Sequence, residues 1–211
     1  MLDSIMYYSI EEQNTIKYPY EYHISINTSN IKLSYIEHIL QSTGSKLIII
    51  DFEDNSINSH TMTSKRMISS YNEAIEDINN LIRVLRYNNI EVIRYKLESI
   101  CTNPIKHIYY ETHIQTIVTN NDISKLLDLQ KNHNIHISRN RFKVFDNSTS
   151  IQMITLRNYG KLKEFESLVS LLLDELKELN IQTKKIELES VIIDSNVGYD
   201  KDWLNSKNDK H

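Results

Sequence analysis

The sequence contains two similar segments, and this internal repeat constrains the fold more than any other feature. Tyr20–Ile26 (YEYHISI) aligns with Tyr110–Thr116 (YETHIQT), so that Tyr, Glu, His and Ile recur 90 residues apart. Two further pairs of matching blocks follow in the same order at an offset of 91 residues: 62–66 with 153–157, and 97–99 with 188–190. Three ordered blocks at nearly constant spacing predict two copies of one structural unit.

Hydrophobic periodicity predicts the same order of elements in each copy. In the first copy we expect strands near 18–27, 46–52, 60–66 and 90–98, and helices near 31–43 and 70–88. In the second copy we expect strands near 108–118, 135–145, 150–157 and 181–190, and helices near 121–132 and 160–179. This order, βαββαβ, predicts an α+β fold: a tandem duplication of a ferredoxin-like unit, with mostly antiparallel sheets and both helices on one face of each.

The repeat also sets the predicted domain boundaries. We expect a first ferredoxin-like unit over 1–102, a second over 105–191, and a C-terminal strap or tail over 192–211. Pro104 falls in the short connection between the units, and Trp203 and Leu204 in the tail are expected to pack against the body.

Charge and composition exclude several classes of protein. The formal net charge is −4 and the Lys and Arg residues are scattered, so we expect no binding along duplex nucleic acid; a small phosphorylated ligand or an RNA end remains a compatible partner. The single cysteine, Cys101, excludes an intrachain disulfide and a multi-cysteine zinc site. No secretory signal and no run of about 18 apolar residues is present, which predicts a soluble, cytoplasmic protein without a membrane segment. The sequence predicts no cofactor and leaves the oligomeric state open.

Strand alternation collects polar residues on one face of each predicted sheet. Because successive side chains point to opposite faces, the tyrosines and isoleucines of the first strand should face the helices and its Glu and His the other side. In the first copy the polar face gathers Glu21, His23, Ser25, Ser64, Arg66 and Glu98. In the second copy it gathers Glu111, His113, Gln115, Thr155, Arg157 and Glu189.

These polar positions have two interpretations. In the first interpretation they have no function beyond the fold: they form a solvated sheet face, or a structural Glu–His hydrogen bond kept for stability. Alternatively they form a site, because they are shared by both copies while most other surface positions differ. If a pseudo-two-fold axis brings the two faces together, they line a cleft with two histidines, two arginines and several carboxylates.

The first of these strands carries a short motif. His23-Ile24-Ser25-Ile26 fits the pattern His-hydrophobic-Thr/Ser-hydrophobic, and with the duplication it resembles the 2H phosphoesterases, which carry one such motif in each half. The resemblance implies a metal-independent phosphodiesterase that acts on a 2′,3′-cyclic phosphate or a 2′-5′ linkage. It implies that His23 and His113 are the general base and general acid.

The resemblance also suggests roles for the neighbouring residues. Hydroxyl or amide groups would hold phosphate oxygens, and arginines would stabilise developing charge. The implied substrate-binding residues are Ser25, Gln115, Ser64, Thr155, Arg66 and Arg157, with Glu21, Glu111, Glu98 and Glu189 as supporting residues. The second motif departs from the pattern, because Gln115 stands where Ser or Thr is expected.

Two alternatives use the same residues differently. Glu21, His23, Glu111 and His113 offer two carboxylates and two imidazoles to a divalent metal. Alternatively, the polar faces bind a ligand or a protein partner without catalysis. We expect His60, which has no matched histidine in the second copy, to lie at the surface.

Overall fold

A computed structural model describes residues 16–52, 59–100, 107–142 and 149–200 of the 211-residue chain. The strands are β1 (Tyr18–Ile26), β2 (Lys46–Phe52), β3 (His60–Ser69), β4 (Val92–Ser99), β5 (Tyr109–Thr119), β6 (Ile135–Asn140), β7 (Thr149–Asn158) and β8 (Gln182–Asp194). The helices are α2 (Leu33–Gln41), α3 (Tyr71–Tyr87), α4 (Asn120–Asn132) and α5 (Leu162–Glu178), and a short 3-10 helix spans Val197–Asp200. The fold is α+β with antiparallel strand pairs, and the predicted order of strands and helices is confirmed.

The described residues pack into two compact units. The first contains 16–47, 61–100, 107–108 and 189–196, and the second contains 48–52, 59–60, 109–142, 149–188 and 197–200. Two segments therefore pack differently from the division that the repeat predicts: most of β2 belongs to the second unit and the end of β8 to the first. Cys101, Pro104, Trp203 and Leu204 lie outside the described residues.

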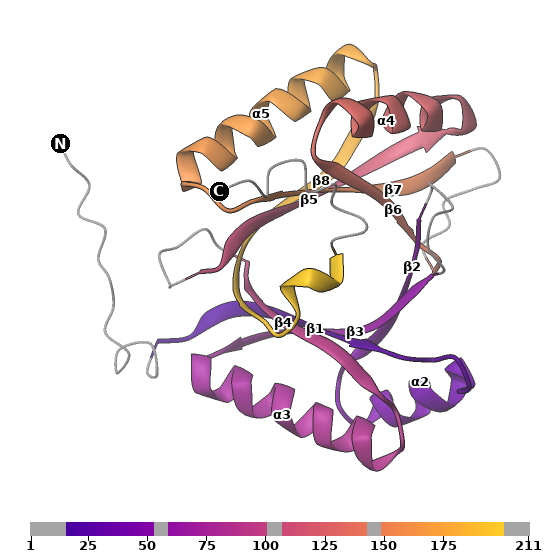
Figure 1. Cartoon of the computed structure of the whole chain (residues 1–211), viewed down its shortest axis with the longest axis vertical. Coiled ribbons are helices and arrows are strands. Elements are labelled where there is room, and N and C mark those ends of the chain that lie inside the picture. Colours follow the sequence, from indigo (N-terminus) through magenta and orange to yellow (C-terminus); the bar gives the residue numbers. More distant parts are fainter. Residues whose placement is uncertain (1–15, 53–58, 101–106, 143–148, 201–211) are drawn as a thin grey trace. The chain divides into compact units, whose positions relative to one another are not determined.

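The first unit is built on a sheet with β1 in a central position. Antiparallel pairing places β3 on one side of β1 and β4 on the other, and the end of β8 pairs with β4. Helices α2 and α3 lie on the same face of these strands (Figure 1). Tyr20, Tyr22 and Ile24 of β1 are fully buried in the apolar core beneath these helices, as the alternation predicted. At the Ser25/Ile26 position the pairing with β4 shifts register, which places Val92 opposite Ile26.

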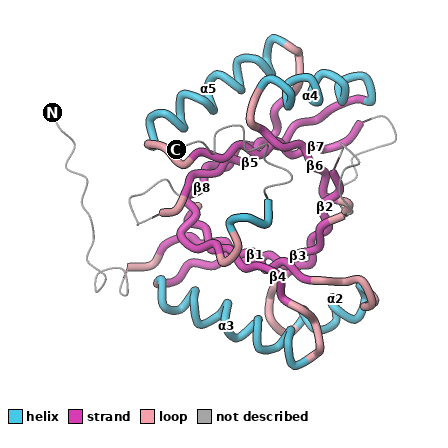
Figure 2. Tube along the Cα trace, in the orientation of Figure 1, coloured by secondary structure: helices cyan, strands magenta, loops and turns pink. Residues whose placement is uncertain are grey.

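The second unit has the strand order β2–β6–β7–β5–β8, and α4 and α5 lie together on one face of its sheet (Figure 2). Its core contains Tyr110 and Ile114 of β5, with Leu126 of α4 and Phe165 of α5. Strand β2 is attached to β6 by backbone pairing. Next to this strand pair the Arg141 guanidinium donates to both oxygens of Asp51, at 3.1 and 2.6 Å, and these bonds lower the pKa of the Asp51 carboxyl.

The predicted helix and strand boundaries agree with the structure within about three residues, except at the ends of β6 and β8. β6 was expected to continue to 145, but it ends at Asn140, where a turn follows. β8 was expected to end near 190 with an irregular tail from 192, but it continues to Asp194 and is followed by the 3-10 helix. The extension forms because 190–194 pair with β4, whose paired residues lie 91 to 98 positions earlier in the sequence, and local periodicity does not report such a distant partner. None of the four helices is long and apolar enough to cross a membrane within the described part of the chain.

A polar network joins α3 to the sheet in the first unit. The Tyr22 hydroxyl donates to Asp77 Oδ2 at 2.7 Å, and Lys65 Nζ lies 2.9 and 2.8 Å from the two oxygens of the same carboxylate. Burial raises the pKa of the Tyr22 hydroxyl above its ordinary value, and the Asp77 carboxylate raises it further. Tyr22 therefore stabilises the fold in its neutral form.

We expect Tyr22→Phe to lower the free energy of unfolding by about 1.5 kcal/mol at neutral pH, because the hydroxyl bonds to a charged group. Since the folded-state pKa lies above the unfolded-state value of about 10, this contribution is present below that pH and is lost as the pH rises above it. Urea unfolding at pH about 8 and about 11 measures the difference between wild type and variant, which should shrink at the higher pH. Tyr87→Phe, at an 88% exposed tyrosine, is the matched control, and an equal pH dependence in both variants would contradict the assignment.

Candidate functional site

The sheet face opposite the helices carries the predicted polar residues, and most of them are buried. In the first unit Glu21, Ser25, Ser64 and Glu98 are each at most 7% exposed. In the second unit Glu111, Gln115 and Arg157 are at most 8% exposed. The interpretation as a solvated sheet face is therefore wrong for these residues. Buried charges are tolerated only where they are paired or hydrogen-bonded, so their partners decide what the face can do.

In the first unit the central group is the Glu21 carboxylate. Ser64 Oγ donates to its Oε1 at 2.6 Å and Arg66 Nε donates to its Oε2 at 2.5 Å. The strand register explains both bonds, because β1 and β3 pair with Glu21 opposite Arg66 and His23 opposite Ser64. Two of the predicted substrate-binding residues are thus bonded to a carboxylate.

His23 lies on the same face with two carboxylates at one ring nitrogen. Its Nε2 is 3.2 Å from Glu98 Oε2 and 3.7 Å from Glu21 Oε1. Lys96 forms an ion pair with Glu98, which is fully buried. The imidazole keeps 18% exposure, so it is more accessible than either carboxylate beside it.

The same face carries a buried ion pair that was not predicted as part of the site. Arg94 Nε and Nη2 donate to the two oxygens of Asp194, at 2.7 and 2.5 Å. Alternation along β4 puts Arg94 on the same side as Glu98, whereas Asp194 lies in the segment that was expected to be a tail. The apolar run Val191-Ile192-Ile193 directly before Asp194 was the available signal that the strand continues.

In the second unit Glu111 and Arg157 form the corresponding pair. Arg157 Nε and Nη2 both donate to Glu111 Oε1, at 3.0 and 2.8 Å, and the guanidinium carbon lies 4.1 Å from the centre of the Tyr109 ring. His113 Nε2 is 3.6 Å from Glu111 Oε2, and its Nδ1 is hydrogen-bonded to Thr155 Oγ1 at 3.0 Å. The register again places Glu opposite Arg and His opposite a hydroxyl residue.

Three further predicted site residues are buried on their strands. Ser25 and Gln115 are buried on their strands, at 4% and 8% exposure. Glu189 is 2% exposed and packs in the first unit, although the repeat groups it with the second copy. The prediction that His60 lies at the surface is wrong: this first residue of β3 is 5% exposed, and its ring packs against that of Tyr199, with 5.1 Å between the ring centres.

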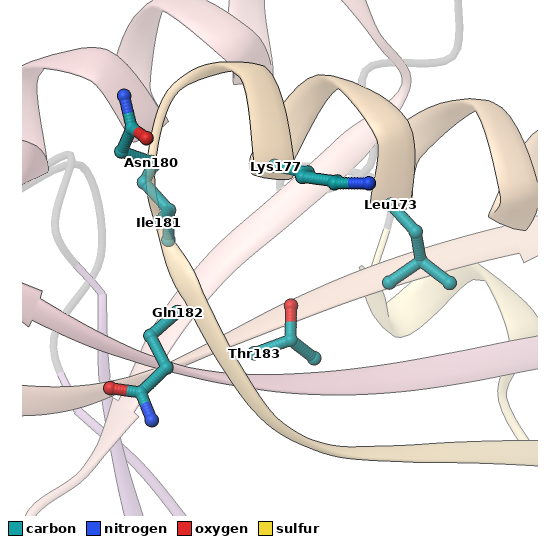
Figure 3. Close-up of a pocket in the computed structure, with 6 residues that line it drawn as sticks. All are labelled: Leu173, Lys177, Asn180, Ile181, Gln182 and Thr183. Carbon is teal, nitrogen blue, oxygen red and sulfur yellow. The ribbon is translucent and has the colours of Figure 1, made fainter.

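A separate shallow pocket of about 340 Å³ lies in the second unit where α5 ends and β8 begins (Figure 3). It is lined by Leu173, Lys177, Asn180, Ile181, Gln182 and Thr183. None of the predicted site residues lines it, and it offers neither a carboxylate nor an imidazole.

No protein-family model and no curated protein matches the chain.

The two Glu–Arg pairs provide a matched test of how much each polar network stabilises the protein. Arg157 is 5% exposed, so Arg157→Met leaves Glu111 charged and buried, and we expect a loss of about 3 kcal/mol. Arg66 is 48% exposed, so Arg66→Met should cost about 1 kcal/mol or less, because solvent screens the exposed charge. Urea unfolding of the two variants measures the difference, and equal losses would contradict the assignment of Arg157 as the more strongly coupled arginine.

Proposed function

We propose that the protein is a metal-independent phosphodiesterase of the two-histidine kind, a hydrolase that acts on a small cyclic or 2′-5′ linked nucleotide or on an RNA end. His23 and His113 are its proton-transfer groups. The observation that carries the proposal is the repeated cross-strand arrangement, in which a His faces a hydroxyl residue and the Glu two positions earlier faces an Arg.

The exposure of the side chains supports these roles. A group that exchanges protons with a substrate must be reachable, and the two imidazoles keep 18% and 23% exposure beside carboxylates that are at most 9% exposed. Each imidazole lies within 4 Å of a carboxylate, which restricts its orientation and stabilises the imidazolium form that arises during the reaction. Imidazole is the side chain whose ordinary titration range lies nearest neutral pH, so one histidine can accept a proton while another donates one.

The proposed reaction is hydrolysis with two proton transfers. One imidazole removes a proton from the attacking water as the water oxygen forms a bond to phosphorus. The bond from phosphorus to the leaving ribose oxygen breaks, and the second imidazolium gives its proton to that oxygen. The negative charge that develops on the phosphoryl oxygens is stabilised by guanidinium groups, for which Arg66 is the more accessible candidate at 48% exposure.

We also propose that each half is a ferredoxin-like unit. The strand arrangement supports this view, because the first strand of each copy lies between the third and fourth strands of that copy: β1 between β3 and β4, and β5 between β7 and β8. Antiparallel pairing in β1–β3, β1–β4 and β5–β7 is the pairing that such a unit requires.

We expect His23→Ala and His113→Ala each to lower the hydrolysis of 2′,3′-cyclic and 2′-5′ linked substrates at least a hundredfold, since general acid–base groups contribute roughly that much each. Initial rates are measured by chromatography of the products, with His38→Ala as a control at an exposed histidine of α2. If each single variant keeps about half of the wild-type rate, the histidines do not serve one reaction. Absence of turnover by wild type across the panel also refutes the proposal.

A divalent-metal site is the second candidate, and one observation in the first unit favours it. Glu21 and Glu98 present oxygens to the same nitrogen of His23, at 3.7 and 3.2 Å, and such mixed oxygen and nitrogen donors suit Zn²⁺ or Mn²⁺. Repeating the rate measurement with excess chelator, and measuring metal in the purified protein, separates the two candidates. Phosphodiesterase activity that survives chelation supports the two-histidine mechanism, and stoichiometric metal lost in Glu98→Gln supports the metal site.

A further inference from the structure

The two halves use their matched hydroxyl residues differently. Ser64 lies opposite His23 in the register and Thr155 lies opposite His113. Ser64 Oγ bonds to the Glu21 carboxylate at 2.6 Å, whereas Thr155 Oγ1 bonds to the imidazole itself, 3.0 Å from Nδ1. The resemblance to the 2H phosphoesterases implied a phosphate-binding role for both hydroxyls.

We propose that Thr155 is a positioning residue. Its hydroxyl donates a hydrogen bond to His113 Nδ1 and thereby fixes the imidazole tautomer that carries the ring proton on Nε2. This inference rests on the proposed function for its catalytic consequence, while its structural part concerns only contacts within the second unit. It changes Thr155 from a phosphate ligand to a residue that orients the proton-transfer group.

The direction of the hydrogen bond follows from the charge on the other side of the ring. Glu111 Oε2 lies 3.6 Å from His113 Nε2, while Arg157 donates twice to the other oxygen, Oε1. A carboxylate attracts an N–H group and repels a nitrogen lone pair, so the neutral imidazole is more stable with its proton on Nε2. Nδ1 is then an acceptor, and the Thr155 hydroxyl rotates to donate to it.

The backbone holds this arrangement in place. Thr155 and His113 are directly opposed on β7 and β5, a pair of strands joined along ten residue pairs from Tyr110↔Asn158 to Thr119↔Thr149. A β-branched side chain has few allowed rotamers, so the Thr155 hydroxyl reaches Nδ1 at little cost in side-chain entropy. Nε2 is consequently the nitrogen that exchanges protons with a substrate.

The first unit has no equivalent of this bond. Ser64 bonds to the carboxylate, and no hydrogen bond to His23 Nδ1 is found among the residues that the structure describes. The inference therefore predicts unequal behaviour of the two histidines: one tautomer fixed at His113, and no such constraint from Ser64 at His23.

The test is a set of ring ¹⁵N spectra of the full-length protein, at a pH about two units above the ordinary titration range of histidine. In wild type we expect a pyrrole-type signal for His113 Nε2 and a pyridine-type signal for Nδ1, with the peaks assigned by their loss in His113→Gln. Thr155→Val removes the hydroxyl at nearly constant volume and should move both signals toward an average of the two tautomers, whereas Thr155→Ser should restore the wild-type pattern. Ser167→Ala, at an exposed hydroxyl of α5, is the control that should change neither signal.

Either of two spectral results overturns the inference: a proton on Nδ1 in wild type, or unchanged His113 signals in Thr155→Val. The wild-type spectrum is decisive even if a variant fails to fold.

In the activity assay, Thr155→Val should lower kcat about fivefold, the effect of one lost neutral hydrogen bond, with KM unchanged and with rescue by Thr155→Ser. A raised KM with unchanged kcat would instead identify Thr155 as a phosphate ligand. If wild type turns over no substrate, the proposed function fails, while the spectra still decide the role of Thr155.

Discussion

Pairing of buried charges across neighbouring strands is the constraint on which the arrangement of the polar faces depends. A carboxylate taken out of water on a sheet face must be matched by donors, and in each unit the residue directly opposite supplies a guanidinium. Because side chains alternate along a strand, the same register that pairs Glu with Arg also places the histidine opposite a hydroxyl. A shift of one residue would move the whole set to the apolar side, so the polar pairs and the tyrosine and isoleucine core support one register.

The same register gives the two faces different chemistry. In the first unit the arginine is half-exposed and the serine bonds to the carboxylate, while the imidazole contacts two glutamates. In the second unit the arginine is buried against a tyrosine ring and the threonine bonds to the imidazole. Equal positions in the sequence therefore do not imply equal roles. The matched strands share a set of polar residues, and the surrounding residues give each set its own contacts.

Local patterns predicted the elements well, because the information is contained within each segment. Alternation located β1 and β5 within one residue, and the spacing of apolar residues located α3 and α5 within about two. The polar face could also be predicted, since parity fixes which side chains share a side. Three features could not be predicted, because they depend on partners distant in sequence: the burial of that face, the extension of β8 and the packing of β2 with the second unit. Nor could the partners of the two hydroxyls: Ser64 and Thr155 occupy matched positions, and only side-chain geometry distinguishes their bonds.

The path of β8 has a consequence for the order of folding. Residues 189–196 belong to the first unit, where Arg94 pairs with Asp194 across 100 residues of intervening chain. During synthesis β4 leaves the ribosome before the part of β8 that pairs with it, so this edge of β4 has no partner until residues 190–194 have also been made. An exposed edge of this kind invites association with other chains. The completion of the first unit therefore waits for β8, and slow closure of this long-range pairing is expected from its loop length.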